Sequence, residues 1–319
     1  MRSRLFALTL AVVVGSSLLS SFAGTALTLS MLELYGLRTA VVNGIVFSVA
    51  LIVATPGGGV LCDRHEPRVL LSLSQMMVAL GCGAVGLVSV RDVDTAMAVI
   101  PAAMSVVGIV QALTAPSVRV LVQYCRYNAA SPQAYPVVRA GQNIARVLGP
   151  GAAGLVVGQG ARWLPFALIV GYAVLLGLVA RHLPHMGMAR NEPSGRVVAA
   201  GIRSASWSRM VGAARGWVGD LAAGARAFVD YPWLVVLSAS SFVVLAAWTA
   251  GFRYLAPDLF LHQGGDAQHW GMLVSVFSAG SVIASLATLR LRTDRSILWS
   301  FVFCPACTSL AVGCFWAGV

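Results

Sequence analysis

Long apolar runs recur along the chain, and short polar segments that hold most of the charged residues separate them. Each run is about 18–28 residues long, and about 20 apolar residues are enough for one helix to cross a hydrocarbon layer. The nine runs cover approximately residues 5–32, 39–62, 69–90, 95–118, 140–160, 163–180, 233–252, 270–289 and 296–319. This pattern predicts an all-α polytopic membrane protein with about nine transmembrane helices.

The composition indicates that lipid is the solvent of these runs. Of the 319 residues, 58% are hydrophobic and 10% are charged, which is more apolar surface than one water-soluble core can bury. The net charge of +11 would suggest nucleic acid in a soluble protein, but the basic residues lie between the apolar runs, so we expect no nucleic-acid partner. The first run is too long for a secretion signal, although small residues around Ala23 leave a cleaved signal as the alternative.

The basic residues also predict the orientation of the helices. All 22 are arginine, which we interpret as GC-rich codon usage and hence a bacterial source. With the N-terminus in the cytoplasm, seventeen arginines lie inside and only Arg38, Arg91, Arg162 and Arg253 lie outside, as the positive-inside rule requires. We therefore expect a multi-pass protein of the bacterial inner (plasma) membrane with a cytoplasmic N-terminus.

The longest polar interval divides the chain into three parts. Residues 1–183 predict an N-terminal six-helix transmembrane bundle, residues 184–231 a basic cytoplasmic linker, and residues 232–319 a partial C-terminal bundle of three helices. A weak repeat relates the bundles, because Gly44-Ile-Val-Phe-Ser-Val49 is similar to Gly271-Met-Leu-Val-Ser-Val276. Repeated halves are typical of secondary transporters.

The most specific motif lies between the second and third runs and reads Gly59-Val-Leu-Cys-Asp63-Arg64-His-Glu-Pro-Arg68. Gly59 permits close helix contact, and Asp63 beside two arginines can form a charged latch at the cytoplasmic rim. A solvated turn that obeys the positive-inside rule is the alternative. The segment resembles the Gly-x-Leu-x-Asp-Arg-x-Gly-Arg-Arg signature of the major facilitator superfamily, with Glu66 where the family prefers glycine, and this resemblance implies a gating motif.

A second motif, in the fifth run, reads Gly141-Gln-Asn-Ile-Ala-Arg146-Val-Leu-Gly149-Pro150-Gly-Ala-Ala-Gly154. Gly149 and Pro150 weaken a helix and predict a bend, and Gly154 allows a neighbouring helix to pack closely. An ordinary kinked span is the alternative. The motif resembles the glycine-proline motif of the superfamily's antiporters, although the glycine spacing differs.

Across residues 5–319 the order of features is similar to the branch of the superfamily that exports drugs and siderophores, including enterobactin and macrolides. Further matching segments are Pro116, Leu221-Ala-Ala-Gly-Ala-Arg226, Tyr231-Pro-Trp233 and Leu255-Ala-Pro-Asp258. The resemblance implies the major facilitator fold and export. Two departures exist: the fourth run has Gln111 but not the buried arginine of many proton-coupled drug antiporters, and the chain stops within its ninth span although the family usually has twelve.

Ionisable groups within the runs are candidate functional residues, because a charge at membrane depth is costly. Arg146 must face protein or water, where it holds either an anionic substrate group or a partner carboxylate in a structural ion pair. Gln111 is a second candidate substrate contact. Glu33 and Asp258, near the external ends of their runs, are candidate proton carriers, with snorkelling surface charges as the alternative.

Catalytic and cofactor chemistry has little support in the sequence. Cys304-Pro-Ala-Cys307 has the spacing of a redox dithiol but no cationic neighbour that would activate a thiol. There is no nucleotide-binding loop, dinucleotide fingerprint or nucleophile elbow. The histidines lack clustered carboxylates or cysteines around them. We therefore expect no enzymatic activity, no cofactor and no metal.

The leading hypothesis is a secondary active transporter that exports amphipathic small molecules by alternating access, driven by protons. The main alternative is a truncated, non-transporting membrane protein that acts as a scaffold or partner, which the end of the chain at Val319 motivates. Three further helices encoded directly downstream would remove that alternative. A membrane-embedded thiol oxidoreductase is the third class.

Overall fold

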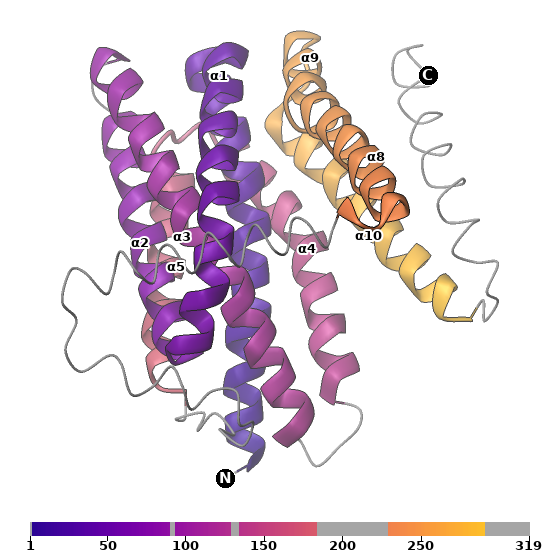
Figure 1. Cartoon of the computed structure of the whole chain (residues 1–319). Helices are drawn as coiled ribbons and strands as arrows, with labels where there is room; N and C mark the ends of the chain where they lie inside the picture. The colour runs from indigo at the N-terminus through magenta and orange to yellow at the C-terminus, as the bar shows by residue number, and fades with distance from the viewer. Residues whose placement is uncertain (1, 90–92, 129–133, 184–228, 291–319) are drawn as a thin grey trace, which may run out of the picture.

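The computed structural model describes residues 2–89, 93–128, 134–183 and 229–290 (Figure 1). Within these residues the chain forms helices and turns and no strand. Five of the helices are long and apolar enough to cross a membrane. The predicted all-helical class is therefore confirmed and is compatible with a membrane protein. The predicted linker lies almost entirely outside the described residues, as do the ninth run and Cys304 and Cys307.

The helical segments follow the predicted runs closely. Their bounds are α1 (Arg2–Arg64), α2 (Pro67–Ser89), α3 (Val93–Asn128), α4 (Ala134–Gly158), α5 (Leu164–Arg181), α8 (Pro232–Trp248), the π-helix η2 (Thr249–Leu255), α9 (Ala256–His262) and α10 (Ala267–Arg290). Helical structure is present at each of the first eight runs. The largest differences are at the fourth run, where α3 continues past residue 118 to Asn128, and at the seventh run, where η2 and α9 continue the helix past residue 252 to His262.

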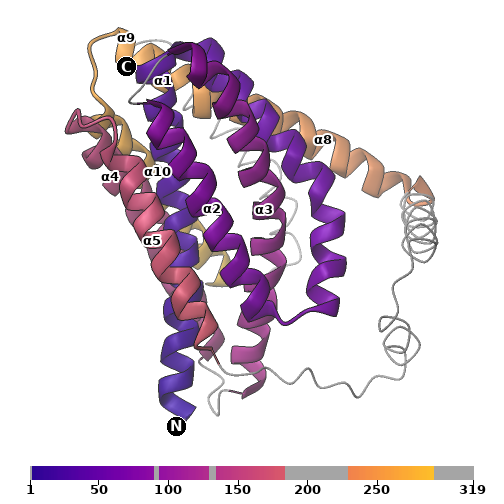
Figure 2. The same ribbon diagram turned by 90° about the vertical axis from the view of Figure 1, so that its left-hand side faces the viewer.

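The first two runs form one continuous helical element, α1, with a kink at Gly36. The φ of Gly36 is 75°, a left-handed conformation that glycine adopts without steric cost. Figure 2 shows the first half of α1 rising from the N-terminus and the second half returning towards the start of α2. Gly36 therefore divides α1 into the two antiparallel segments that the apolar pattern predicts at 5–32 and 39–62.

The N-terminal helices pack into one bundle in which α1 lies against α3 and α4, and α2 lies between α3 and α5. Leu29, Ile100 and Ile169 are fully buried in its main apolar core. Glycines allow the closest crossings of α1 and α3, because a Cβ at Gly58 would overlap the Ala112 carbonyl. Pro116 has no N–H to bond that carbonyl, so the glycine packs where the proline has freed a backbone oxygen.

The C-terminal helices are attached to this bundle mainly through α10, which packs along α4. By contrast, α8 has no buried residue within the described part of the chain and exposes large apolar side chains such as Phe242 and Leu245. Water would solvate such a surface poorly, whereas hydrocarbon would solvate it well. The exposed face of α8 thus agrees with a helix that lies in lipid.

Candidate functional site

A cavity of about 510 Å³ lies between the N-terminal bundle and the helices that follow the linker. Both halves of α1, together with α2 and α3, form one side, and α8, η2 and α10 form the other. A cavity of this size suits a small organic molecule, because ligand pockets usually measure about 300–1,000 Å³. The cavity is therefore the candidate binding site.

Uncharged polar side chains line the side of the cavity that the N-terminal bundle forms. Gln111 of α3 donates its Nε2 hydrogen to Ser20 Oγ of α1 over 3.4 Å. Asn43 and Gln75 are buried, and their side-chain oxygens have no hydrogen-bond partner among the described residues. This side of the cavity can therefore hydrogen-bond a ligand without presenting a charge.

Aromatic rings line the opposite side. Trp248 and Phe252 stack with ring centroids 4.4 Å apart and planes 17° apart, and Phe252 also contacts Trp270 at 5.6 Å. We call Trp248, Phe252 and Trp270 the aromatic wall; all three line the cavity. Because Trp248 and Phe252 are four residues apart, they lie on one helical face. The wall offers flat apolar surface to a ligand.

Arg253 is the only charged residue among the described residues that line the cavity. It belongs to η2, the π-helix that precedes Pro257. A Cβ placed on Gly24 of α1 would lie 3.6 Å from Arg253 Nη2, so the guanidinium reaches across to the N-terminal bundle. Single π-helical turns inside longer helices often mark functional sites.

Tyr254, the next residue of η2, also contacts the N-terminal bundle. A Cβ at Gly44 would overlap the Tyr254 hydroxyl, so only glycine leaves room for this ring. The π-helix therefore touches α1 on both sides of the Gly36 kink, through Gly24 and Gly44.

The predicted bend motif lies where α4 contacts both α1 and α10. Pro150 cannot donate a backbone hydrogen bond to the Arg146 carbonyl, and Ser21 Oγ donates to that carbonyl over 3.2 Å instead. Ser21 can come this close because a Cβ at Gly149 would lie 2.7 Å from Ser21 Cβ. The proline and the glycine thus act together: one frees a carbonyl, and the other admits its new donor.

Small residues fill the contact between α4 and α10, which we call the α4–α10 seam. A Cβ at Gly154 would lie 2.7 Å from the Cα of Gly271, and one at Gly151 would lie 3.7 Å from Ser275 Cβ. Ala267, Gly271 and Ser275 recur every fourth residue, which places them on one face of α10. Backbone contact at this seam joins the N-terminal bundle to the C-terminal helices.

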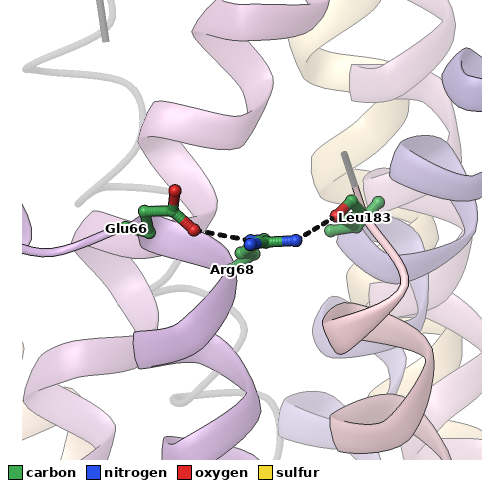
Figure 3. A network of polar contacts seen from close by, with 3 residues as sticks. All are labelled: Glu66, Arg68 and Leu183. Carbon is green, nitrogen blue, oxygen red and sulfur yellow. Dashed lines mark hydrogen bonds and ion pairs between the residues drawn. The ribbon is translucent and has the colours of Figure 1, made fainter. Parts of the chain in front are cut away.

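Of the predicted gating motif, Arg68 is the residue whose side chain the structure describes. Its Nε donates to Glu66 Oε2 at 2.6 Å and its Nη1 donates to the Leu183 carbonyl at 2.8 Å (Figure 3). Arg68 therefore connects the start of α2 to the segment after α5. The backbones of Gly59, Asp63 and Arg64 belong to α1, and the side chains of Asp63 and Arg64 lie outside the described part.

The other predicted site residues are placed differently. Gln111 lines the cavity, but Arg146, Glu33 and Asp258 do not. Arg146 and Glu33 are exposed. The Asp258 carboxyl is 17% exposed and lies 3.6 Å from the Nδ1 of His262.

Sequence reasoning missed Arg253 and the aromatic wall. The seventh apolar run ends at residue 252, so the pattern predicts Arg253 outside the membrane. The four-residue spacing of Trp248 and Phe252 is the signal that could have indicated the wall. Among the described residues no group of three His, Cys, Asp or Glu side chains could hold a metal ion.

No family model matches the chain, and no curated protein matches it. The cavity, the α4–α10 seam and the two motifs are therefore the features that indicate a function.

Proposed function

We propose that this protein is a secondary active transporter of the major facilitator type, which exports amphipathic small molecules in exchange for protons. The observation that carries the proposal is the cavity of about 510 Å³ between two groups of helices, with uncharged polar groups on one side and the aromatic wall on the other. A ligand that has a polar part and an apolar part fits such a lining.

Alternating access requires that the two groups of helices move relative to each other around the cavity. The α4–α10 seam supports such a movement, because it is built from glycine and small residues with few side chains to interlock. The Gly149–Pro150 motif, from which the sequence predicts a bend, lies directly beside the seam. We assign the pivot to this region.

The gating role of Asp63, Arg64 and Arg68 belongs to the same proposal. Arg68 supports it, because its bonds to Glu66 and to the Leu183 carbonyl connect the turn before α2 to the segment after α5. The proposal keeps the orientation that the arginines predict: the N-terminus and the turn between α1 and α2 face the bacterial cytoplasm, and the apolar helices lie in the inner membrane.

Proton coupling needs a group that gains and loses a proton within reach of the moving helices. Asp258 is the better of the two candidates, because its carboxyl is largely buried. It also lies in the first turn of α9, directly after the π-helix that lines the cavity. Glu33 is exposed. We therefore propose Asp258 as the proton carrier.

The test is accumulation by inverted membrane vesicles that contain the full chain and carry an imposed proton gradient. Three radiolabelled probes share one ring system: 2-naphthoate, 2-naphthamide and 2-naphthylmethylammonium. We expect at least one to accumulate, and a protonophore to abolish the accumulation. Gln111→Leu should impair it, whereas Gln159→Leu, at an exposed turn, should not. Equal counts in vesicles with and without the protein, for all three probes, would remove the transport proposal.

A further inference from the structure

We infer that the cavity selects an organic anion with an aromatic body, held by Arg253 and the aromatic wall. The inference concerns binding, and it rests on the proposed function only for the claim that the bound anion is then transported.

The charge of the described cavity lining favours an anionic ligand. The described lining of the cavity includes one guanidinium, Arg253, and no carboxylate. No carboxylate of the described residues lies within 4.0 Å of Arg253, so no ion pair neutralises it there. Arg253 is exposed in the lining of the open cavity, so a ligand can reach its guanidinium without first breaking an ion pair, and hydrogen bonds to a guanidinium are charge-assisted. An anionic ligand group would supply the opposite charge and the acceptors of these bonds.

The Arg253 guanidinium is also placed so that a ligand can reach it. The Arg253 guanidinium extends from η2 to α1 at Gly24, and the missing side chain at that position leaves its Nη2 open towards the N-terminal bundle. The guanidinium lies over the ring of Tyr254, with Arg253 Cζ 6.0 Å from the ring centroid. This contact leaves the N–H groups along the edges of the guanidinium plane able to donate hydrogen bonds to a carboxylate.

The aromatic wall specifies the rest of the ligand. Phe252 is the residue directly before Arg253, and its ring stacks on Trp248 and contacts Trp270. A ligand's aromatic ring that binds against this wall therefore lies beside the Arg253 guanidinium. Offset or tilted contacts between rings add about 0.5–1.5 kcal/mol to apolar burial. The ligand class that uses both features is an aromatic carboxylate or a similar aromatic anion.

The same charge disfavours cations. A single guanidinium without a nearby carboxylate repels an ammonium group, and the rest of the described lining offers only neutral dipoles. A charge-assisted hydrogen bond changes affinity by about ten- to a hundred-fold. We therefore expect the order anion, then neutral amide, then cation, with about ten-fold or more between the first two.

The experiment is a binding titration with the detergent-solubilised full chain, followed by quenching of tryptophan fluorescence and confirmed by calorimetry. The probes are again 2-naphthoate, 2-naphthamide and 2-naphthylmethylammonium, at pH 7.5. Arg253→Gln should reduce naphthoate affinity at least ten-fold and leave naphthamide affinity within about two-fold. Arg253→Lys should keep part of the preference for the anion. Arg162→Gln, an exposed arginine in the α4–α5 turn, is the matched control and should bind as the wild type does.

Three results would overturn the inference: naphthamide or the ammonium probe binding wild type as tightly as naphthoate, an unchanged preference in Arg253→Gln, or a lost preference in Arg162→Gln. If Arg253→Gln does not fold, the order of the three probes on wild type still decides. Selective binding of naphthoate without vesicle accumulation would refute transport and leave this inference standing. Accumulation in vesicles without a binding preference for naphthoate would refute this inference and leave transport standing.

Discussion

A designed disulfide across the α4–α10 seam tests whether this contact moves during transport. The double substitution is Gly151→Cys with Ser275→Cys. The two Cβ atoms would lie 3.7 Å apart, and natural disulfides have Cβ atoms about 3.8 Å apart, so the bond should form without backbone displacement. The Ser275 hydroxyl is buried and has no hydrogen-bond partner among the described residues, so its replacement sacrifices no bond there.

The expected effect follows from the distance. A pivot that opens the seam by only a few ångströms would carry the Cβ atoms beyond the range of about 3.5–4.5 Å that a disulfide allows. A covalent bond cannot yield to the few kcal/mol that separate conformations of a carrier. Oxidation should therefore reduce gradient-driven accumulation to less than about a tenth, and reduction with dithiothreitol should restore it.

The matched control joins α4 to α1 inside the N-terminal bundle. In Val14→Cys with Gly141→Cys the Cβ atoms would also lie 3.7 Å apart, but both helices belong to one group and need not separate. This crosslink should form equally well and leave accumulation unchanged. Formation of the seam crosslink with undiminished accumulation would refute the pivot. A seam crosslink that does not form under conditions in which the control forms would refute the packing itself.

Three further predictions concern single residues. Ser21→Ala should lower the free energy of unfolding by about 0.5–1.5 kcal/mol, because the Arg146 carbonyl loses its donor; unfolding in sodium dodecyl sulfate followed by circular dichroism measures this, and an unchanged midpoint would contradict it. Asp266 precedes α10 and accepts bonds from the His269 backbone N–H and imidazole, which lower the pKa of its carboxyl. Its contribution to stability is therefore present above the unfolded pKa of about 3.9 and is lost as the pH falls through the lower folded value. Asp266→Asn should flatten this acid-side decline of the melting temperature, and a decline as steep as that of wild type would rule the contribution out. Asp258→Asn should abolish accumulation driven by the proton gradient but keep probe binding, and retention of both would exclude Asp258 as the proton carrier.

The helix positions could be predicted from the sequence because the length of an apolar run is a local property. Runs at 5–32 and 39–62 correspond to the two halves of α1, and Gly36 between them takes the left-handed conformation that the turn requires. The missing helical hydrogen bond at Pro150 was also predictable, because a proline removes one such bond wherever it stands in a helix. The new donor, Ser21, lies 125 residues away along the chain and could not be found from the motif.

The cavity could not be predicted because it depends on which helix faces lie opposite each other. Arg146 and Arg253 both interrupt apolar sequence, and the sequence assigns the first to a span and the second to an external turn. Both residues are exposed, but the fold places Arg253 in the lining of the cavity and Arg146 outside it. The deciding features are the continuation of the seventh helix beyond residue 252 and the contact of η2 with α1, both of which are tertiary.

Alternating access is tested most directly by measuring whether the cavity can be reached from each side of the membrane. With the six native cysteines replaced, Thr25→Cys places one thiol in the cavity lining, and a membrane-impermeant maleimide is applied to right-side-out and to inverted vesicles. Arg162→Cys serves as the one-sided control. If access alternates, the cavity thiol is labelled from both sides and bound naphthoate slows the labelling. Labelling from one side only, with or without a proton gradient, would contradict alternating access.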